Sequence, residues 1–212
     1  MKKVFLAIVL TFILTAYVSM EAQGLTPGGG RRQHDGFYLS LALGPVFGEI
    51  KDNVDLGIFG KEAYIYSGTG AILDVKIGGR VAENLLLHGT ITSAAIPGPT
   101  VEHESTGKKE TIDSDNSLGE VMFGAGLTYY FMPTNIFISG SVGLGMFTFS
   151  GGHDVDASDA GIGVQLKAGK EWWVGDDWGL GVAVFYSTTA VEEDYLKYGS
   201  NRFGVMFNAT FN

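Results

Sequence analysis

From Phe37 to the end of the chain, apolar and small or polar residues alternate with a period of two. Successive side chains of a β-strand point to opposite sides, so this period predicts strands and not helices. The alternation recurs in eight segments, and no helical period competes with it between them. The predicted strands are GFYLSLALG, GAILDVKIGG, NLLLHGTIT, EVMFGAGLTYYF, IFISGSVGLGM, GIGVQLKAGKEW, GLGVAVFYS and RFGVMFNATF.

The two faces of these strands differ in composition. One face is continuously apolar, whereas the other consists mostly of Gly, Ser, Ala and Thr with a few isolated charges. A soluble sheet turns long polar side chains to water, which favours a different arrangement here. Small residues suit the crowded inside of a narrow barrel of about eight strands, and the apolar face then faces lipid. The all-β fold expected is an eight-stranded antiparallel up-and-down transmembrane barrel, and the alternative is a soluble β-sandwich.

The connections between the strands alternate in length. Those after the second, fourth and sixth strands are short: GGRVAE, MPTN and VGDD. Those after the first, third, fifth and seventh are longer and polar, and they cover residues 47–67, 95–117, 151–159 and 188–200. Outer-membrane barrels have short periplasmic turns and long external loops. The pattern therefore predicts a periplasmic N-terminus and acidic loops on the outside.

All three tryptophans of the chain, Trp172, Trp173 and Trp178, flank one short turn. Tryptophan collects at membrane interfaces, so we expect it to form an aromatic girdle at the periplasmic side. In a soluble protein, the same residues would instead pack beneath a hairpin. Other members expected in this girdle are Phe37, Tyr129, Phe131, Phe137 and Phe211, and the opposite girdle would contain Tyr64, Tyr66, Phe147, Phe149 and Tyr186.

The N-terminus begins with Lys2-Lys3 and continues with an apolar run to Met20. This arrangement is typical of a secretory signal peptide, which we place at residues 1–22; an uncleaved membrane anchor is the alternative. Residues 23–35 contain Pro-Gly-Gly-Gly and are predicted to be a flexible periplasmic lead-in. The chain has no cysteine, which excludes disulfides and thiolate sites, and a net charge of −9, which disfavours nucleic-acid binding.

In its alternating strands, aromatic girdle and loop lengths, the segment 36–212 resembles the small eight-stranded bacterial outer-membrane β-barrels, such as outer-membrane proteins A, X and W. The last strand, RFGVMFNATFN, is similar to the assembly signal of that family, which ends with an aromatic residue, whereas here Asn212 follows Phe211. The resemblance implies a monomer in the outer membrane of a Gram-negative bacterium. It also implies outer-membrane lipid and the barrel-insertion machinery as partners, and leaves an external ligand at the loops as a possible further one.

Several charged or titratable residues fall on the inward face of the predicted strands. They include two lysines and three acids, and they should pair because isolated buried charges are costly. We expect a hydrogen-bonded plug that fixes the barrel register, with the lining of a thin polar pore as the alternative. The predicted lumen network consists of Asp74, Lys76, His88, Glu120, Lys167 and Glu171.

Sites for catalysis, metals or cofactors are not expected. The four histidines are His34, His88, His103 and His153, and none has an outward serine beside it near a barrel rim. His103 and His153 could approach Ser105 or Ser150, but proximity in sequence is not a catalytic triad. The segment GGHDVDASD could offer oxygen ligands to Ca²⁺, although a solvated acidic loop is favoured. No glycine-rich nucleotide-binding motif occurs in the sequence. The glycines fall on inward strand positions, where steric fit explains them.

Three functions remain open at this point. The first is a non-enzymatic integral outer-membrane protein with a structural or surface-interaction role and acidic external loops. The second is a narrow channel for small or hydrophobic solutes, and the third is a lipid-modifying enzyme. A fold alone does not choose between them.

Overall fold

The computed structural model describes residues 34, 36–55, 61–151, 154–193 and 196–212. Eight long strands dominate it: β1 (Phe37–Asp55), β2 (Lys61–Ala82), β3 (Leu85–Pro97), β6 (Ser117–Phe131), β7 (Ile136–Gly151), β9 (Gly161–Trp173), β10 (Trp178–Glu193) and β11 (Leu196–Phe211). Three short strands lie between them: β4 (Thr100–His103), β5 (Lys108–Thr111) and β8 (Asp154–Ala157). No helix among the described residues is long and apolar enough to cross a membrane. The predicted signal peptide lies outside the described residues.

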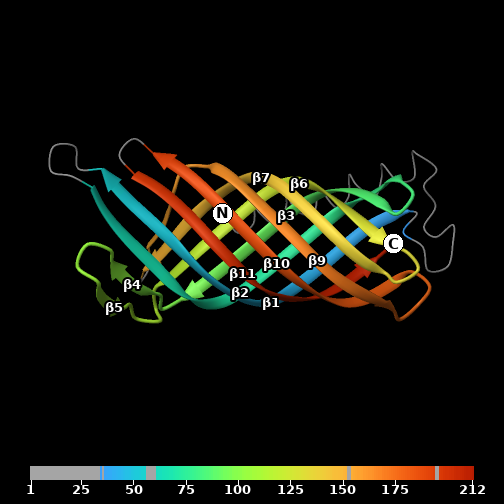
Figure 1. Cartoon of the computed structure of the whole chain (residues 1–212), viewed down its shortest axis with the longest axis horizontal. Coiled ribbons are helices and arrows are strands. Elements are labelled where there is room, and N and C mark those ends of the chain that lie inside the picture. Colours follow the sequence, from blue (N-terminus) through green and yellow to red (C-terminus); the bar gives the residue numbers. More distant parts are fainter. Residues whose placement is uncertain (1–33, 35, 56–60, 152–153, 194–195) are drawn as a thin grey trace.

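The long strands form a closed antiparallel barrel. Strand β1 pairs with β2 on one side and with β11 on the other, so the sheet has no free edge. Starting at Tyr38 and moving from partner to partner around the barrel, the path returns to β1 at Gly48, a displacement of ten residues. This shear tilts the strands, as Figure 1 shows. The predicted fold class and strand number of the barrel are confirmed.

The barrel has two unlike ends (Figure 1). At one end, called the short-turn end, tight connections join β2 to β3, β6 to β7 and β9 to β10, and the C-terminus lies there too. Asn84 and Asn135 in two of these turns have φ angles of 57° and 55°, a conformation that asparagine tolerates better than most residues. At the other end, called the hairpin end, the β4–β5 hairpin projects beside the barrel wall.

Alternation along the strands separates an inner from an outer face. Inward side chains are buried, and they gather in three apolar clusters and two polar layers. The outer face is a belt of exposed large apolar side chains, including Leu144 at 60% and Phe207 at 66% exposure. Monomeric soluble proteins do not leave so extensive an apolar surface in water. The belt is a lipid-facing surface, which rules out the alternative of a soluble sandwich.

Some inward positions accept only glycine. A Cβ added to Gly143 would lie 2.2 Å from the carbonyl oxygen of Phe123 and 2.5 Å from Cα of Gly124. Both are backbone atoms of the neighbouring strand β6 and cannot move away cheaply. Here close approach of two strands, as well as the narrow interior, requires the small residue.

The prediction of four long loops at the hairpin end is largely wrong. The segment 47–67 is strand up to Asp55 and again from Lys61, and 188–200 is strand except at residues 194–195, which lie outside the described part. The segment 95–117 contains the β4–β5 hairpin, and 151–159 contains β8. Beyond the membrane the strands have neither lipid nor a narrow lumen to sort their side chains. Strand pairing therefore continues there without the alternation of apolar and polar residues from which strands were predicted.

The predicted second girdle is also partly wrong. Phe147 is fully buried inside the barrel, where Tyr66 and Phe149 pack against its cluster. Phe137, predicted for the first girdle, points inward as well and contacts Tyr130 with ring centroids 5.5 Å apart. Both phenylalanines have the same parity on β7 as the inward glycines, so the period of two predicts their direction better than their aromatic character does.

Candidate functional site: the lumen and the two ends of the barrel

The first polar layer in the lumen is centred on Asp74. Its Oδ2 accepts a bond from the ammonium of Lys167 at 3.1 Å, and its Oδ1 lies 3.3 Å from the ammonium of Lys76. Lys76 also donates to Oε1 of Gln165 at 3.0 Å and to Oγ of Ser141 at 3.3 Å. All these side chains are buried, and they come from β2, β7 and β9. The layer therefore ties strands on different sides of the barrel to each other.

His88 extends this layer toward the short-turn end. Its Nδ1 lies 2.9 Å from Oγ1 of Thr90, and its Nε2 lies 3.0 Å from Oγ1 of Thr128. Thr128 in turn donates to Oγ of Ser139 at 2.9 Å. Both ring nitrogens are engaged and the residue is 2% exposed, so His88 is a structural member of the network.

The second polar layer pairs Glu120 with Arg202. The guanidinium of Arg202 binds Oε1 of Glu120, to which Thr189 also donates at 2.5 Å. Arg202 is the first residue of the last predicted strand, but it was not assigned to a face and so was left out of the predicted lumen network. Its parity is that of the inward Gly204, which is the signal that would have found it. With Arg202 included, three buried bases face three buried acids.

Glu171 is held differently from the other two acids. Among the described residues it makes no ion pair; its Oε2 accepts a bond from the Tyr130 hydroxyl at 3.1 Å and its Oε1 one from Thr210 at 2.7 Å. These hydroxyl groups satisfy a carboxyl group that is 2% exposed. Glu171 therefore belongs to a third set of polar contacts, close to the short-turn end.

Apolar clusters separate the polar layers along the barrel axis. From the short-turn end, Ala183, Phe185 and Val191 of β10 belong in turn to the three clusters. The cluster around Tyr38, Tyr130 and Phe137 lies on the short-turn side of the Asp74 layer, and the cluster around Phe147 lies on the hairpin side of the layer of Arg202 and Glu120. Bulky side chains therefore occupy the interior at three levels.

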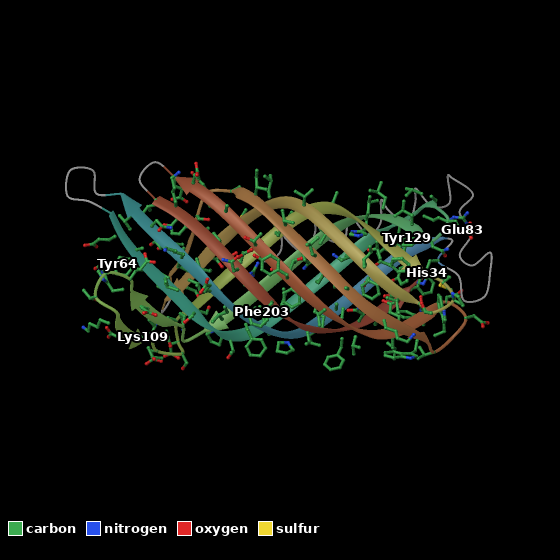
Figure 2. The ribbon with its side chains drawn as sticks, in the orientation of Figure 1. His34, Tyr64, Glu83, Lys109, Tyr129 and Phe203 are labelled. Carbon is green, nitrogen blue, oxygen red and sulfur yellow. The ribbon has the colours of Figure 1, made fainter. Side chains whose placement is uncertain are left out.

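His34 closes the barrel at the short-turn end (Figure 2). It is 1% exposed, its ring stacks on Tyr130 with centroids 3.4 Å apart, and its two nitrogens lie 2.8 and 2.7 Å from Oδ1 of Asn212 and Asn135. His34 is the only residue of the predicted flexible lead-in 23–35 that the structure describes. The backbone N–H of Asn212 also donates to the carbonyl of Asp177 at 3.0 Å. The residue that departs from the aromatic C-terminal pattern thus helps to fasten this end.

The predicted girdle at the short-turn end lies largely on the outer face. Tyr129, Phe131, Trp172 and Trp178 are 38–52% exposed, and Phe37 and Phe211 are partly covered by contact with each other. Trp173 is partly buried instead, with its ring 5.0 Å from that of His34. The three tryptophans therefore divide between the lipid-facing surface and the cap.

The hairpin end carries most of the exposed acidic residues. Three lysine–glutamate pairs occur there among the described residues: Lys51 with Glu104 at 2.7 Å, Lys109 with Glu102 at 3.0 Å and Lys197 with Glu192 at 2.8 Å. Other acids at this end make no ion pair with a described residue: Glu49, Glu110, Asp113, Asp115, Asp156 and Asp159. The result is a surface with an excess of negative charge among the described residues.

Asp52 of β1 is a further acid at this end, and it is partly buried. Its Oδ1 is buried without a hydrogen-bond partner among the described residues. Partial burial raises the pKa of Asp52, and the nearby carboxylate of Glu193 raises it further. Burial and the charge of Asp52 also raise the pKa of Tyr66 and Tyr198. Ionised Asp52 therefore destabilises this part of the β1–β11 ladder.

His103 has contacts that superficially suggest a hydrolytic site. Its Nδ1 lies 3.0 Å from Oγ of Ser105 and 3.2 Å from Oγ1 of Thr106, and its Nε2 lies 4.0 Å from Glu62. The backbone N–H groups of Thr106 and Gly107 both donate to the carbonyl of His103, so they cannot stabilise an oxyanion. These contacts are those of a tight hairpin turn.

The possible calcium loop falls partly outside the described residues. His153 is not described, and neither is the side chain of Asp154. Asp156 and Asp159 are exposed, and the residues that the structure covers include no group of three or more metal-ligating side chains.

No protein-family model and no curated protein matches the chain. Solved structures with a similar fold include neisserial surface protein A, with 17% identity, coverage of 80% of this chain and 95% of that one, and a TM-score of 0.47. Outer membrane protein OprG from Pseudomonas aeruginosa has 11% identity, coverage of 86% and 100%, and a TM-score of 0.48. The outer membrane protease OmpT from Escherichia coli has 11% identity, coverage of 84% and 97%, and a TM-score of 0.41.

The closed barrel of eight strands and its apolar outer belt decide the class of protein. The chain folds as a small outer-membrane β-barrel. The identities to these solved structures are 17% or lower and the TM-scores lie below 0.5, so they say nothing about the activity of this chain.

Proposed function

We propose that this barrel is a non-enzymatic and non-conducting anchor that presents a rigid acidic surface at its hairpin end to the cell exterior. The observation that carries the proposal is the packing of the lumen. Three apolar clusters and two ionic layers fill it in alternation, and His34 covers the short-turn end. An ion in transit would have to displace Phe147, Tyr130 or Phe137, all of which are buried and close-packed.

The strands at the hairpin end support a surface role. Strands β1 and β2 pair continuously as far as Asp55 and Lys61, and β10 and β11 as far as Glu193 and Leu196. Continuous pairing makes this end stiffer than free loops would be. Rigid elements present binding groups more accurately than mobile segments do, which favours recognition of an external partner over simple solvation.

Orientation follows from the same proposal. The short turns and the C-terminus face the periplasm, as in other outer-membrane barrels, and the acidic hairpin end faces outward. Because opposite charges attract and like charges repel, the negative surface favours partners with exposed lysine or arginine side chains.

A liposome-swelling assay tests the proposal against a channel for small or hydrophobic solutes. Protein that has folded into liposomes, checked by its heat-modifiable gel mobility, should admit small sugars no faster than empty liposomes do. Swelling at the rate of a porin would overturn the non-conducting role. Release of fatty acid or peptide from added substrates by the same preparation, lost in His103→Ala, would overturn the non-enzymatic one.

A further inference from the structure

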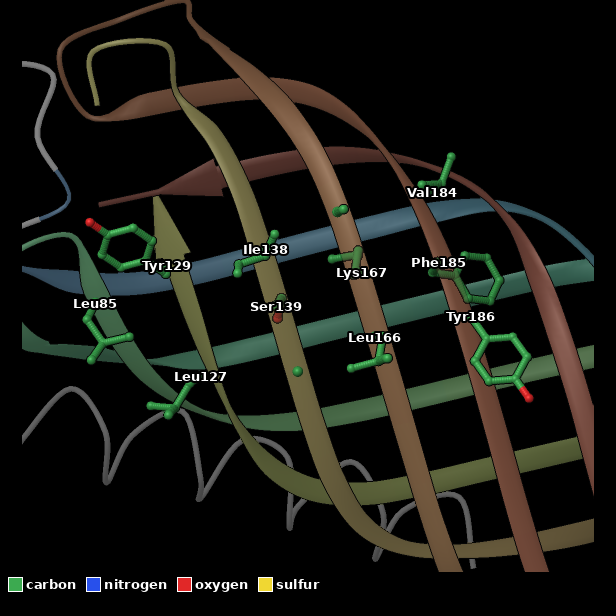
Figure 3. Close-up of a pocket in the computed structure, with 12 residues that line it drawn as sticks. Leu85, Leu127, Tyr129, Ile138, Ser139, Leu166, Lys167, Val184, Phe185 and Tyr186 are labelled. Carbon is green, nitrogen blue, oxygen red and sulfur yellow. The ribbon is translucent and has the colours of Figure 1, made fainter. Parts of the chain in front are cut away.

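An apolar groove of about 620 Å³ runs along the outer wall of the barrel over β6, β7, β9 and β10. Figure 3 shows Leu127 and Tyr129 on one side of it and Val184 and Tyr186 on the other, with Ile138 and Leu166 between them. The groove lies in the lipid-facing belt. Its lining is almost wholly hydrocarbon, so its natural occupant is also hydrocarbon.

The floor of the groove is low because two small residues meet there. Gly140 of β7 is paired with Leu127 and Leu166, and Ala168 of β9 is paired with Ile138 and Val184. A Cβ on Gly140 would find only the side chain of Leu166, at an ordinary contact distance of 3.6 Å. The backbone does not require glycine here, unlike at Gly143, and the missing side chain simply leaves room.

A single positive charge lies beside the groove. Lys170 occupies the next outward position of β9 after Ala168, and the following outward residue is Trp172 of the girdle. Its ammonium lies 2.5 Å from the carbonyl oxygen of Thr134 and 5.7 Å from the ring centroid of Trp172, so it points toward the short-turn end. Between the level of Trp172 and the level of Tyr186, no other described residue on the outer face of the barrel carries a charge.

We propose that the groove and Lys170 form a binding site for one anionic glycerophospholipid. The ammonium of Lys170 binds the headgroup phosphate at the level of Trp172, and an acyl chain follows β9 into the space above Gly140 and Ala168. The geometry agrees with the layout of a leaflet, because the charge lies at the interface and the apolar groove leads toward the bilayer centre. A charged side chain facing lipid is costly, and a phosphate partner offsets that cost.

Native mass spectrometry with added phosphatidylglycerol tests this site. Wild-type protein in detergent should retain one lipid with a distinct affinity. Gly140→Leu fills the groove and should weaken retention about tenfold, since several methylene contacts are lost. Lys170→Gln should weaken it about fivefold, the effect of one lysine near a phosphate surface. Inorganic phosphate at millimolar concentration should not displace the lipid, because it lacks the acyl chain.

Gly89→Leu is the matched control. Gly89 faces outward on β3, and a Cβ there would approach no atom closer than 3.8 Å, so the variant adds the same side chain to a different part of the lipid-facing wall. Equal retention in all variants would mean that only unspecific lipid adheres, and would overturn the proposal. So would displacement by phosphate alone, or a dimer peak that Gly140→Leu abolishes, which would make a second barrel the occupant. None of these outcomes depends on whether the lumen conducts.

Discussion

Among the described residues, six charged side chains lie buried inside the barrel, three acidic and three basic. Asp74 forms ion pairs with two lysines, Glu120 is paired with Arg202, and Glu171 accepts hydrogen bonds from hydroxyl groups. Buried ion pairs seldom add net stability compared with apolar packing, but removal of one partner leaves the other charge uncompensated. These pairs therefore act mainly to fix which strands lie opposite each other.

Arg202→Met should destabilise the folded barrel by about 3–5 kcal/mol, because Glu120 would remain buried without its base. The double variant Arg202→Met with Glu120→Leu should recover most of that loss, since neither charge remains. Urea unfolding of the protein in detergent, followed by tryptophan fluorescence, measures both. A double variant no more stable than the single one would show that the pair contributes more than charge compensation.

Gly143→Ala should prevent assembly, whereas Gly140→Ala on the same strand should be tolerated. The first Cβ would lie 2.2 Å from a backbone oxygen of β6, and the second meets only a side-chain carbon at 3.6 Å. The folded fraction is read from gels of boiled and unboiled samples, since a folded barrel migrates differently from the denatured chain. Equal folding of both variants would contradict the close approach of β6 and β7.

Asp52→Asn should stabilise the hairpin end at neutral pH. Because the pKa of Asp52 is raised in the folded state, its ionisation costs stability as the pH rises from 3.8 through the raised value, and this cost is fully present above that value. Amide exchange around residues 50–54 and 196–199 should be slower in the variant at neutral pH and unchanged below 3.8. Slower exchange at both pH values would point to packing instead of charge.

At the scale of elements, the strands continue beyond the membrane belt as paired ribbons. The β4–β5 hairpin adds two further short strands beside β2, with β4 paired to it at Tyr64 to Ser67. This part of the molecule can vary without affecting the barrel, because its residues lie outside both the lumen and the lipid-facing belt.

Replacement of residues 100–111 by a short Asn-Gly turn should leave the barrel folded with nearly unchanged resistance to urea. It should also lower slightly the affinity for a cationic partner of the hairpin end, since three glutamates are removed together with Lys108 and Lys109, a net loss of one negative charge. A lysine-rich peptide titrated against both proteins measures this difference. Equal binding would place the recognition surface elsewhere.

The period of two was sufficient to predict every strand within the membrane belt. There, lipid on one side and a crowded lumen on the other sort side chains by polarity, as in the run from Leu39 to Leu43. Beyond the belt this sorting ends, and the extensions of β1 and β10 could not be distinguished from loops. Phe137 and Phe147 were misplaced because aromatic character was given more weight than parity.

The candidate site was predictable only in part. The six predicted lumen residues all lie buried on the inner face, because inward parity and charge are visible in the sequence. Their partners could not be predicted. Arg202, Tyr130 and Gln165 come from distant strands, and the shear of the barrel decides which side chains are in contact across the lumen. The role of His34 depends on a contact with the last residue of the chain, which no local pattern reveals.

At the scale of the whole molecule, the barrel has an apolar belt on its outer face and buried side chains packed in its interior. Among the described residues, its inward side chains form apolar clusters that alternate with ionic layers. The parts available to a partner are then the acidic hairpin end and the groove beside Lys170. Both are surfaces, which is the reason for assigning the molecule to anchoring and recognition.

Ion conductance across planar lipid bilayers tests this account most directly. Protein shown to be folded by its heat-modifiable mobility would be inserted into the bilayer in concentrated KCl, so that small currents can be detected. The filled lumen predicts a flat baseline at all moderate voltages. Discrete, reproducible current steps from the folded protein would contradict the sealed interior, and the narrow-channel function would then replace the one proposed.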